Sequence, residues 1–193
     1  MPLDIVILGP PGAGKGTQAK KISAERGIPH IATGEMLRAA IDGGTELGLR
    51  VKEIYDRGDL VPDELMIELI RARLRMEDTA AGFLLDGFPR TLQQAEALDG
   101  LLTQLRRPLS IVFDFQIPED IAVERVLGRA QEEGRTDDTP EVILHRLRVF
   151  RRETEPLIAF YRTRGILVGI HAERTVGNVF AEIQEALERA AAA

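Results

Sequence analysis

A nine-residue segment near the N-terminus, Gly9-Pro10-Pro11-Gly12-Ala13-Gly14-Lys15-Gly16-Thr17, constrains this chain more than any other feature of its sequence. It follows an apolar run, Leu3–Leu8, and precedes a helix-like segment, 18–26. Glycines let a backbone wrap around an anion with its N–H groups pointing inward, and a helix N-terminus adds a positive dipole end. Strand, Gly-rich turn, lysine and helix in this order therefore predict a phosphate-binding loop, with Lys15 neutralising the β- and γ-phosphates of a nucleoside triphosphate.

The loop departs from the usual pattern in one position. The hydroxyl residue that normally follows the lysine is displaced, because Gly16 stands there and Thr17 comes next. The loop alone therefore leaves open which residue holds the Mg²⁺ that accompanies a bound triphosphate.

The composition limits the class of protein. The 193 residues suit one domain, and 44% of them are apolar, enough for a substantial core. A net charge of −6 argues against a general nucleic-acid-binding surface. The absence of cysteine excludes disulfides and cysteine-ligated zinc. The N-terminus lacks the features of a signal peptide, and no apolar run approaches the roughly 18 residues of a membrane span, so we expect a cytoplasmic protein without a membrane partner.

Strand-like and helix-like segments alternate along the chain. The apolar runs are Leu3–Leu8, Ile28–Ala32, Gly82–Leu85, Leu109–Phe115 and Ile166–Ile170. The periodic segments are 14–26, 35–42, 46–57, 63–76, 91–104, 119–130, 140–164 and 175–191. This alternation predicts an α/β fold in which helices cover both faces of a five-stranded parallel sheet. Pro156 should kink or split the helix predicted over 140–164.

A second motif follows the third apolar run. Asp86 ends the run, where Mg²⁺ or its water shell beside a triphosphate would need a carboxylate. Gly87 and Pro89 then shape a tight turn that delivers Arg90. An ordinary Asp-Gly turn is the structural alternative. Because ligands bind beyond the carboxyl ends of parallel strands, the presence of the Gly9 loop at the same kind of position favours a functional site.

Five arginines stand at turns or on helices that could face such a site, and guanidinium groups grip phosphate in a bidentate manner. They are Arg38, Arg90, Arg129, Arg135 and Arg146. For any one of them alone, a solvated helix face is the competing interpretation. Two segments fit the alternation poorly and are candidates for mobile inserts: residues 33–61 and residues 128–138.

Four motifs are spread along most of the chain. In sequence order they are Gly9–Thr17, Thr33–Arg38, Asp86–Arg90, and Arg135–Asp138 with Arg146. This order resembles that of the adenylate kinases with a short lid, a nucleoside monophosphate kinase family. The resemblance implies a three-layer P-loop kinase fold in a single domain (1–193), with a core of 1–31, 62–127 and 139–193. It further implies a monophosphate-binding insert (32–61), a short lid (128–138), and transfer from ATP to AMP giving two ADP, with Mg²⁺, in a monomer serving adenine nucleotide homeostasis and AMP salvage.

The resemblance also implies a role for individual residues. ATP would be held by Gly12, Ala13, Gly14, Lys15, Gly16, Thr17, Arg129 and Arg174. AMP would be held by Thr33, Arg38, Asp59, Leu60, Val61, Gly87, Phe88, Pro89, Arg90, Gln94, Arg135 and Arg146. The catalytic group would be Lys15, Arg90, Arg129, Arg135 and Arg146. Asp86 would hold Mg²⁺ through water.

Several of these residues have structural alternatives. Gln94 fits a capping box with Thr91, so it could hold a helix end instead of, or as well as, a base. Asp138 and its neighbour Asp137 could serve only as caps for the helix that begins at Pro140. Two of the three histidines, His30 and His145, show no metal-ligand spacing and are interpreted as packing or surface residues.

Three other functions compete with the predicted kinase. A pyrimidine monophosphate kinase of the same fold is disfavoured by Thr33 and Gln94, which the resemblance associates with adenine. A regulatory GTP switch would need an Asn-Lys-x-Asp motif, which the sequence lacks. An ATP-binding module that transfers no phosphoryl group would be distinguished by an assay of ADP disproportionation.

Overall fold

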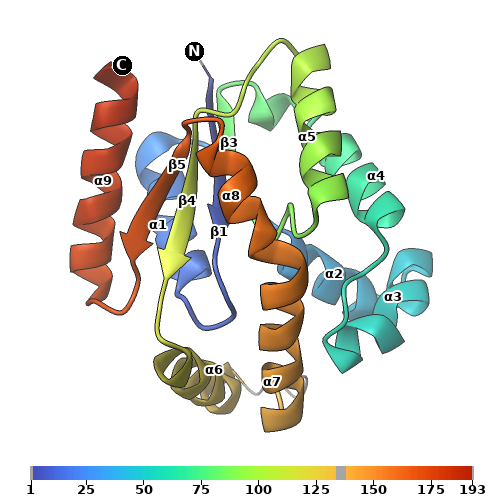
Figure 1. The fold of residues 1–193 in the computed structure, drawn as a ribbon. Helices are drawn as coiled ribbons and strands as arrows, with labels where there is room; N and C mark the ends of the chain where they lie inside the picture. The colour runs from blue at the N-terminus through green and yellow to red at the C-terminus, as the bar shows by residue number, and fades with distance from the viewer. Residues whose placement is uncertain (1, 134–137, 193) are drawn as a thin grey trace.

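The computed structural model describes residues 2–133 and 138–192, which form a twisted parallel sheet between two layers of helices (Figure 1). The strands are β1 (Leu3–Leu8), β2 (His30–Ala32), β3 (Gly82–Asp86), β4 (Ile111–Gln116) and β5 (Leu167–His171). Their order across the sheet is β2-β3-β1-β4-β5, and every pairing is parallel. The predicted α/β fold with a five-stranded parallel sheet is confirmed.

The register of the central strand β1 brings the two predicted motifs together. Ile7 lies opposite Asp86 of β3 on one side and opposite Phe113 of β4 on the other. After β1, the chain forms β2 and β3 on one side of β1 and then β4 and β5 on the other side. The carboxyl end of β1 is therefore a topological switch point. Ligands of open α/β sheets bind at such points.

One face of the sheet is covered by α1 (Lys15–Arg26) and α9 (Val176–Ala192), at the left in Figure 1. Side chains of β1 alternate between the faces, and Ile5 and Ile7 point to this one. They pack in one buried cluster with Ile22 of α1 and Ile183 of α9. This cluster holds the helix that follows the Gly9 loop in a fixed position on the sheet.

The other face is covered by α4 (Asp63–Arg73), α5 (Leu92–Gln104) and α8 (Pro156–Arg162), with the short η1 (Glu77–Thr79) leading into β3. Val6 and Leu8 of β1 point to this face. Ile70, Leu98 and Tyr161 complete its buried cluster. The helix layers on both faces agree with the predicted P-loop kinase architecture.

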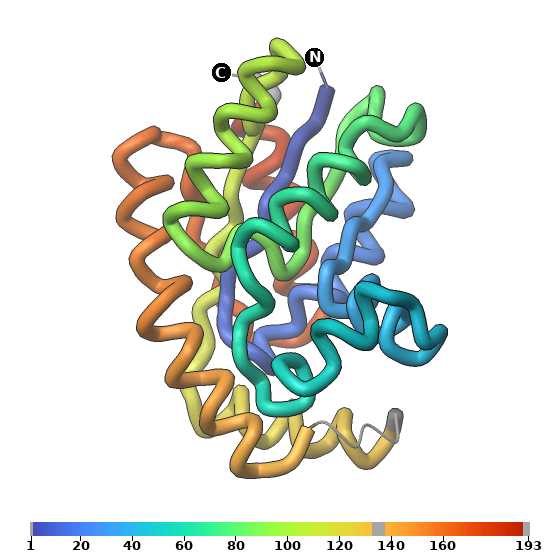
Figure 2. The backbone as a smooth tube through the Cα atoms, turned by 90° about the vertical axis from the view of Figure 1, so that its right-hand side faces the viewer, coloured from blue at the N-terminus to red at the C-terminus, as the bar shows by residue number. Residues whose placement is uncertain are grey.

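The predicted insert 32–61 consists of two short helices, α2 (Thr33–Asp42) and α3 (Glu46–Arg57). The Thr45 side chain caps α3 by accepting a hydrogen bond from Gly48 N. A Cβ on Gly48 would lie 2.0 Å from the carbonyl oxygen of Ala40, so glycine lets the helices pack this closely. Figure 2 shows the pair (blue to teal) beyond the end of the sheet that also carries α6 (Glu119–Glu133) and α7 (Pro140–Val149).

The segment predicted as one helix over 140–164 is divided as expected near Pro156. A π-helical turn, η2 (Phe150–Thr154), follows α7, and Pro156 begins α8. Proline has no N–H to donate and its ring clashes with the preceding turn, so the regular helix cannot continue through it. Glu155 N instead donates to the carbonyl oxygen of Phe150, at 2.9 Å. Within residues 2–133 and 138–192, no helix has both the length and the apolar character needed to cross a bilayer.

Candidate functional site

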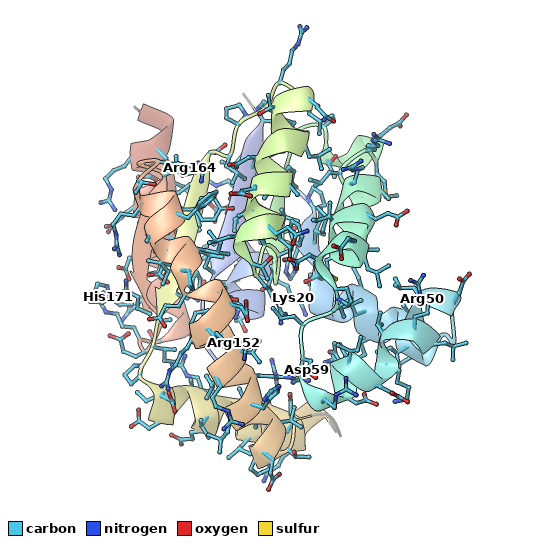
Figure 3. The ribbon with its side chains drawn as sticks, turned by 45° about the vertical axis from the view of Figure 1, so that its right-hand side comes forward. Lys20, Arg50, Asp59, Arg152, Arg164 and His171 are labelled. Carbon is cyan, nitrogen blue, oxygen red and sulfur yellow. The ribbon has the colours of Figure 1, made fainter. Side chains whose placement is uncertain are left out.

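A cleft of about 540 Å³ opens at the carboxyl edge of the sheet, between the Gly9 loop, α2 and α3, the end of β3, α6 and α7. Lys20 and Asp59, both labelled in Figure 3, line it from α1 and from the segment before α4. Many of the predicted site residues line it too: Gly12, Gly14, Lys15, Gly16, Thr17, Arg38, Asp59, Leu60, Asp86, Gly87, Pro89, Arg90, Arg129 and Arg146. The structure thus brings together residues from five separate parts of the chain.

The Gly9 loop requires glycine at defined positions. Gly12 has a φ of 83°, in the left-handed region, and a Cβ on it would lie 2.2 Å from the carbonyl oxygen of Ala122 on α6. Gly14, with a φ of 79°, precedes the first residue of α1. The loop therefore delivers the N-terminus of α1 to the cleft, where its dipole favours an anion.

The Lys15 side chain folds back over this loop. Its Nζ donates to the carbonyl oxygens of Gly9 and Pro10, each at 2.8 Å. Burial lowers the pKa of Lys15 to about 8; the Asp86 carboxylate opposes this shift, and Arg90 and Arg129 add to it. Burial and the neighbouring cations disfavour the charged form of Lys15, and a bound polyanion would stabilise that form. This position therefore suits a phosphate ligand.

The Asp86 carboxylate stays ionised although it is largely buried. Burial by itself would raise the pKa of Asp86, but a hydrogen bond with His30 and the charges of Lys15 and Arg90 outweigh that effect and lower it. His30 Nε2 lies 3.3 Å from Asp86 Oδ2, and the Thr33 hydroxyl donates to the Asp86 carbonyl oxygen at 3.3 Å. His30 is therefore a packing residue with a specific partner in the cleft, which its local sequence did not indicate.

Arg90 is held at the cleft by the turn that precedes it. Its Nε donates to the carbonyl oxygen of Gly87 at 2.9 Å. Gly87 has a φ of 84°, and a Cβ there would lie 2.6 Å from the Thr33 hydroxyl. Burial is the main reason that the pKa of Arg90 is lowered, yet a guanidinium remains charged at any physiological pH.

Asp138 joins two of the predicted arginines. Its side chain is fully buried and accepts hydrogen bonds from Arg129 Nη2, at 2.8 Å, and from Arg146 Nη1. The cap of α7 is Thr139, whose hydroxyl oxygen accepts from Val142 N. The interpretation of Asp138 as the helix cap is therefore wrong, and this carboxylate instead orients guanidinium groups from α6 and α7. Arg135 and Asp137 lie outside the described residues.

The remaining predicted residues do not line the cleft: Ala13, Thr33, Val61, Phe88, Gln94 and Arg174. Val61 and Phe88 belong to the hydrophobic core, so only their backbones are candidates for ligand contact. Gln94 is 2% exposed and lies at the start of α5. Arg174 is half exposed, with its Nη1 3.7 Å from the Glu182 carboxylate. Their ligand-binding roles stay predictions.

Among the cleft residues that sequence analysis did not predict, two make specific polar contacts. Arg125 donates to the carbonyl oxygens of Ala172 (2.8 Å) and Glu173 (3.1 Å), which directly precede Arg174. Arg125 lies one helical turn before the predicted site residue Arg129, and this spacing could have indicated that both side chains face the same cleft. The other is Tyr55 on α3, for which a single aromatic residue on a helix gives no local signal.

The sequence of this chain is similar to those of known proteins. The family model described as adenylate kinase matches residues 7–166. A curated adenylate kinase of Xylella fastidiosa (strain 9a5c) is 48% identical over 183 residues, 95% of this chain and 98% of the relative. One of Xanthomonas campestris pv. campestris (strain 8004) is 46% identical over 185 residues, 96% and 99% respectively. One of Stenotrophomonas maltophilia (strain K279a) is 44% identical over 184 residues, 95% and 98%.

The chain belongs to the adenylate kinase family. The predicted family and the predicted P-loop kinase fold are both confirmed. The segment that matches the adenylate kinase model contains every predicted site residue except Arg174. Membership in this family also favours a phosphotransferase over a regulatory GTP-binding protein and over a module without transfer activity.

Proposed function

We propose that this chain catalyses reversible phosphoryl transfer from ATP to AMP, giving two ADP, and so serves adenine nucleotide homeostasis and AMP salvage. The observation that carries the proposal is the convergence of cationic groups on one cleft. Lys15 of the phosphate-binding loop shares it with four of the predicted arginines, which come from separate elements: Arg38, Arg90, Arg129 and Arg146. A site that must hold two polyanionic nucleotides end to end requires this excess of positive charge.

The transfer needs no general base, because the phosphate of AMP is already an anionic nucleophile. The protein must instead align this phosphate with the γ-phosphate and offset the repulsion between them. We assign the γ-phosphate to the Gly12–Thr17 loop and Arg129, and the acceptor phosphate to Arg38 and Arg90. Arg146, which Asp138 links to Arg129, would lie against the phosphoryl group in transit.

The other predicted contacts follow from where the structure places each group. The Asp59 carboxylate is engaged by Arg57 and His145, so we assign contact with AMP to the main chain of Asp59–Val61. Gly87–Pro89 would likewise contribute backbone. The buried Thr33 and Gln94 side chains would face the adenine once the insert 32–61 closes over it.

The metal ion that phosphoryl transfer requires is proposed to be Mg²⁺, held through water by Asp86. The donor fits a hard cation that keeps most of its water shell, since Asp86 is an ionised carboxylate. Its Oδ2 lies 3.7 Å from the place that a Cβ on Gly16 would take, so the carboxylate borders the phosphate-binding loop. When bound, the ion would neutralise charge on the β- and γ-phosphates.

Water must be kept from the γ-phosphate, or ATP would be hydrolysed instead of transferred. Residues of the insert and of the described part of the predicted lid, 128–133, line the cleft. We propose that the insert 32–61 and the lid 128–138 close only when both nucleotides are present. We further propose that the protein acts as a cytoplasmic monomer and has no nucleic-acid or membrane partner.

The test of the proposal is acceptor specificity. With Mg²⁺ and ATP, the purified chain should phosphorylate AMP with a kcat/KM at least about 10³-fold above those for CMP and UMP, because a site that hydrogen-bonds one base leaves its polar groups unpaired with another. A higher kcat/KM for CMP or UMP than for AMP would instead indicate a pyrimidine monophosphate kinase. Release of phosphate from ATP without any acceptor product would contradict kinase function.

A further inference from the structure

Tyr55, on the last turn of α3, lies between two of the arginines that the proposed function assigns to phosphate groups. The phenolic oxygen of Tyr55 accepts a hydrogen bond from Arg38 Nη2 of α2, at 2.8 Å. The guanidinium carbons of Arg38 and Arg146 lie 5.8 and 5.7 Å from the centre of the Tyr55 ring. All three side chains line the cleft. One aromatic side chain therefore contacts two cations that come from different elements.

An aromatic ring has a chemical advantage over a carboxylate at such a place. Two guanidinium groups that serve neighbouring phosphates repel each other before the ligand arrives. A carboxylate between them would offset the repulsion but would then compete with the phosphate as an anion. The negative face of an aromatic ring attracts a cation without carrying a formal charge. Tyr55 can thus help to hold both arginines in place without adding a second anion beside them, since Asp138 is already bonded to Arg146.

The backbone around Tyr55 is fixed against α7 by two further contacts. A Cβ on Gly58, the residue that ends α3, would lie 2.9 Å from Arg146 Cγ, so the end of α3 packs directly on the Arg146 stem. One residue later, the Asp59 carboxylate lies 2.7 Å from His145 Nε2. Asp59 is labelled in Figure 3, where it points toward α7. These two contacts therefore fix the end of α3 against α7 close to the Tyr55 ring.

We propose that Tyr55 is a positioning residue for the acceptor phosphate: its hydroxyl orients Arg38, and its ring orients both Arg38 and Arg146. This inference rests on the proposed function, because it assumes that the acceptor is a nucleoside monophosphate. Tyr55 acts through the arginines, and its two parts have separable effects. The hydroxyl should govern acceptor binding, and the ring should in addition govern transfer, since Arg146 is assigned to the phosphoryl group in transit.

Two substitutions separate these parts. Tyr55→Phe keeps the ring and removes the hydrogen bond to Arg38; it should raise the KM for AMP about tenfold, as expected for loss of a hydrogen bond to a charged group, and leave kcat within about twofold. Tyr55→Leu removes the ring as well; it should raise the KM for AMP further and lower kcat about tenfold. The KM for ATP should change by less than about twofold in both. Arg50→Ala, on the exposed side of the same helix (Figure 3), is the matched control and should match the parent.

Two measurements distinguish a positioning role from a general effect on the fold. Calorimetric titration with AMP alone should show the same loss of affinity in Tyr55→Phe as the KM does, at an unchanged melting temperature. In the Arg38→Lys background, adding Tyr55→Phe should cost less than about twofold, because the hydrogen bond to the guanidinium is already lost. Full additivity of the two substitutions would overturn the proposal.

The failure of this inference is distinguishable from the failure of the proposed function. If the parent phosphorylates AMP and both Tyr55 variants keep its KM for AMP and its kcat, the positioning role is overturned and the kinase function stands. Equal rises in the KM for AMP and for ATP would also overturn it, since they would indicate a distortion of the whole cleft. A parent that neither binds AMP nor turns it over would overturn both.

Discussion

The amide nitrogen of Gln94 donates a hydrogen bond to Asp63, with Nε2 2.7 Å from Oδ1. The amide oxygen of the same side chain accepts from Arg90 N at 2.7 Å, and Thr91 Oγ1 accepts from Gln94 N at 3.2 Å. The predicted helix-start role of Gln94 is therefore present in the structure. It also fixes the orientation of the amide, and each amide group retains one further donor or acceptor position for a base.

The first prediction concerns the preference for AMP over other acceptor nucleotides. Because Gln94 is bonded to Asp63, a test of Gln94 must also take Asp63 into account. Gln94→Glu alone would set a carboxylate against Asp63, and this repulsion would confound any effect on the base. In the double variant Asp63→Asn with Gln94→Glu, the hydrogen bond can form again in the reverse direction, and the oxygen that accepts from Arg90 N is kept. This variant keeps the hydrogen bonds of the helix start but replaces the glutamine N–H groups by a carboxylate oxygen, so the preference for AMP over CMP and UMP should fall about tenfold or more.

The measurement for that prediction is kcat/KM for each acceptor, together with the melting temperature. The double variant should be more stable than Gln94→Glu alone. If it selects AMP as the parent does, with an unchanged KM, Gln94 is a helix cap and not a reader of the base.

Lys15 should be required for transfer and dispensable for the fold. Its ammonium group bonds only to loop carbonyls among the described residues, so Lys15→Met removes no partner that the core needs. We expect turnover to fall about 10³-fold, because Lys15 neutralises charge that develops on the transferring phosphates. The circular dichroism spectrum should match that of the parent. A variant with more than about a tenth of the parent turnover would contradict this role.

The lowered pKa of Lys15 predicts a pH dependence of ATP binding. Bound phosphate favours the charged ammonium, so binding raises the pKa of Lys15 from about 8. Below pH 8 the lysine is already charged, and affinity should be constant. Above pH 8 binding must take up a proton, and affinity should fall by up to about tenfold per pH unit. Calorimetry at fixed Mg²⁺ checks this, and Lys15→Arg, which stays charged, should show no decline over the same range.

Arg146 should contribute more to turnover than to stability. Arg146→Ala leaves Arg129 as a partner for the buried Asp138, so the loss of stability should be about 1–2 kcal/mol. The loss of turnover should reach about 10³-fold, equivalent to about 4 kcal/mol. Arg148→Ala, exposed on the same helix, is the control. The same imbalance is expected for Arg135→Ala. Losses of equal size in both measurements would indicate a structural role alone.

The elements with strong local signals were predictable from the sequence. Strand β1 has the predicted bounds, Leu3–Leu8, because a continuous apolar run followed by a Gly-rich loop admits few alternatives. The helix over 46–57 also matches, since Thr45 caps it and Gly58 ends it. Helix α6 runs to Glu133, beyond the predicted end at 130, and the described part of the predicted lid is therefore helical up to that residue.

The features that sequence could not predict depend on contacts between distant segments. His30 and Asp86 are 56 positions apart, and His145 and Asp59 are 86 apart. Neither histidine has a spacing that points to its partner, because the contact is created by strand order and helix packing. The π-helical turn before Pro156 was likewise not predictable. It depends on how α7 and α8 pack on the rest of the protein as well as on the proline, and local helix propensity does not describe that packing.

The proposed mechanism requires one cleft to align two nucleotide phosphates for direct transfer between them. Phosphorus NMR of the purified chain with ADP as the only nucleotide is the decisive test of this mechanism. In the presence of Mg²⁺, ADP should convert to equal amounts of ATP and AMP with no inorganic phosphate, and a chelator should stop the conversion until Mg²⁺ is added back. Unchanged ADP with Mg²⁺ present, or conversion of ADP to AMP and inorganic phosphate, would show that the cleft does not carry out direct transfer.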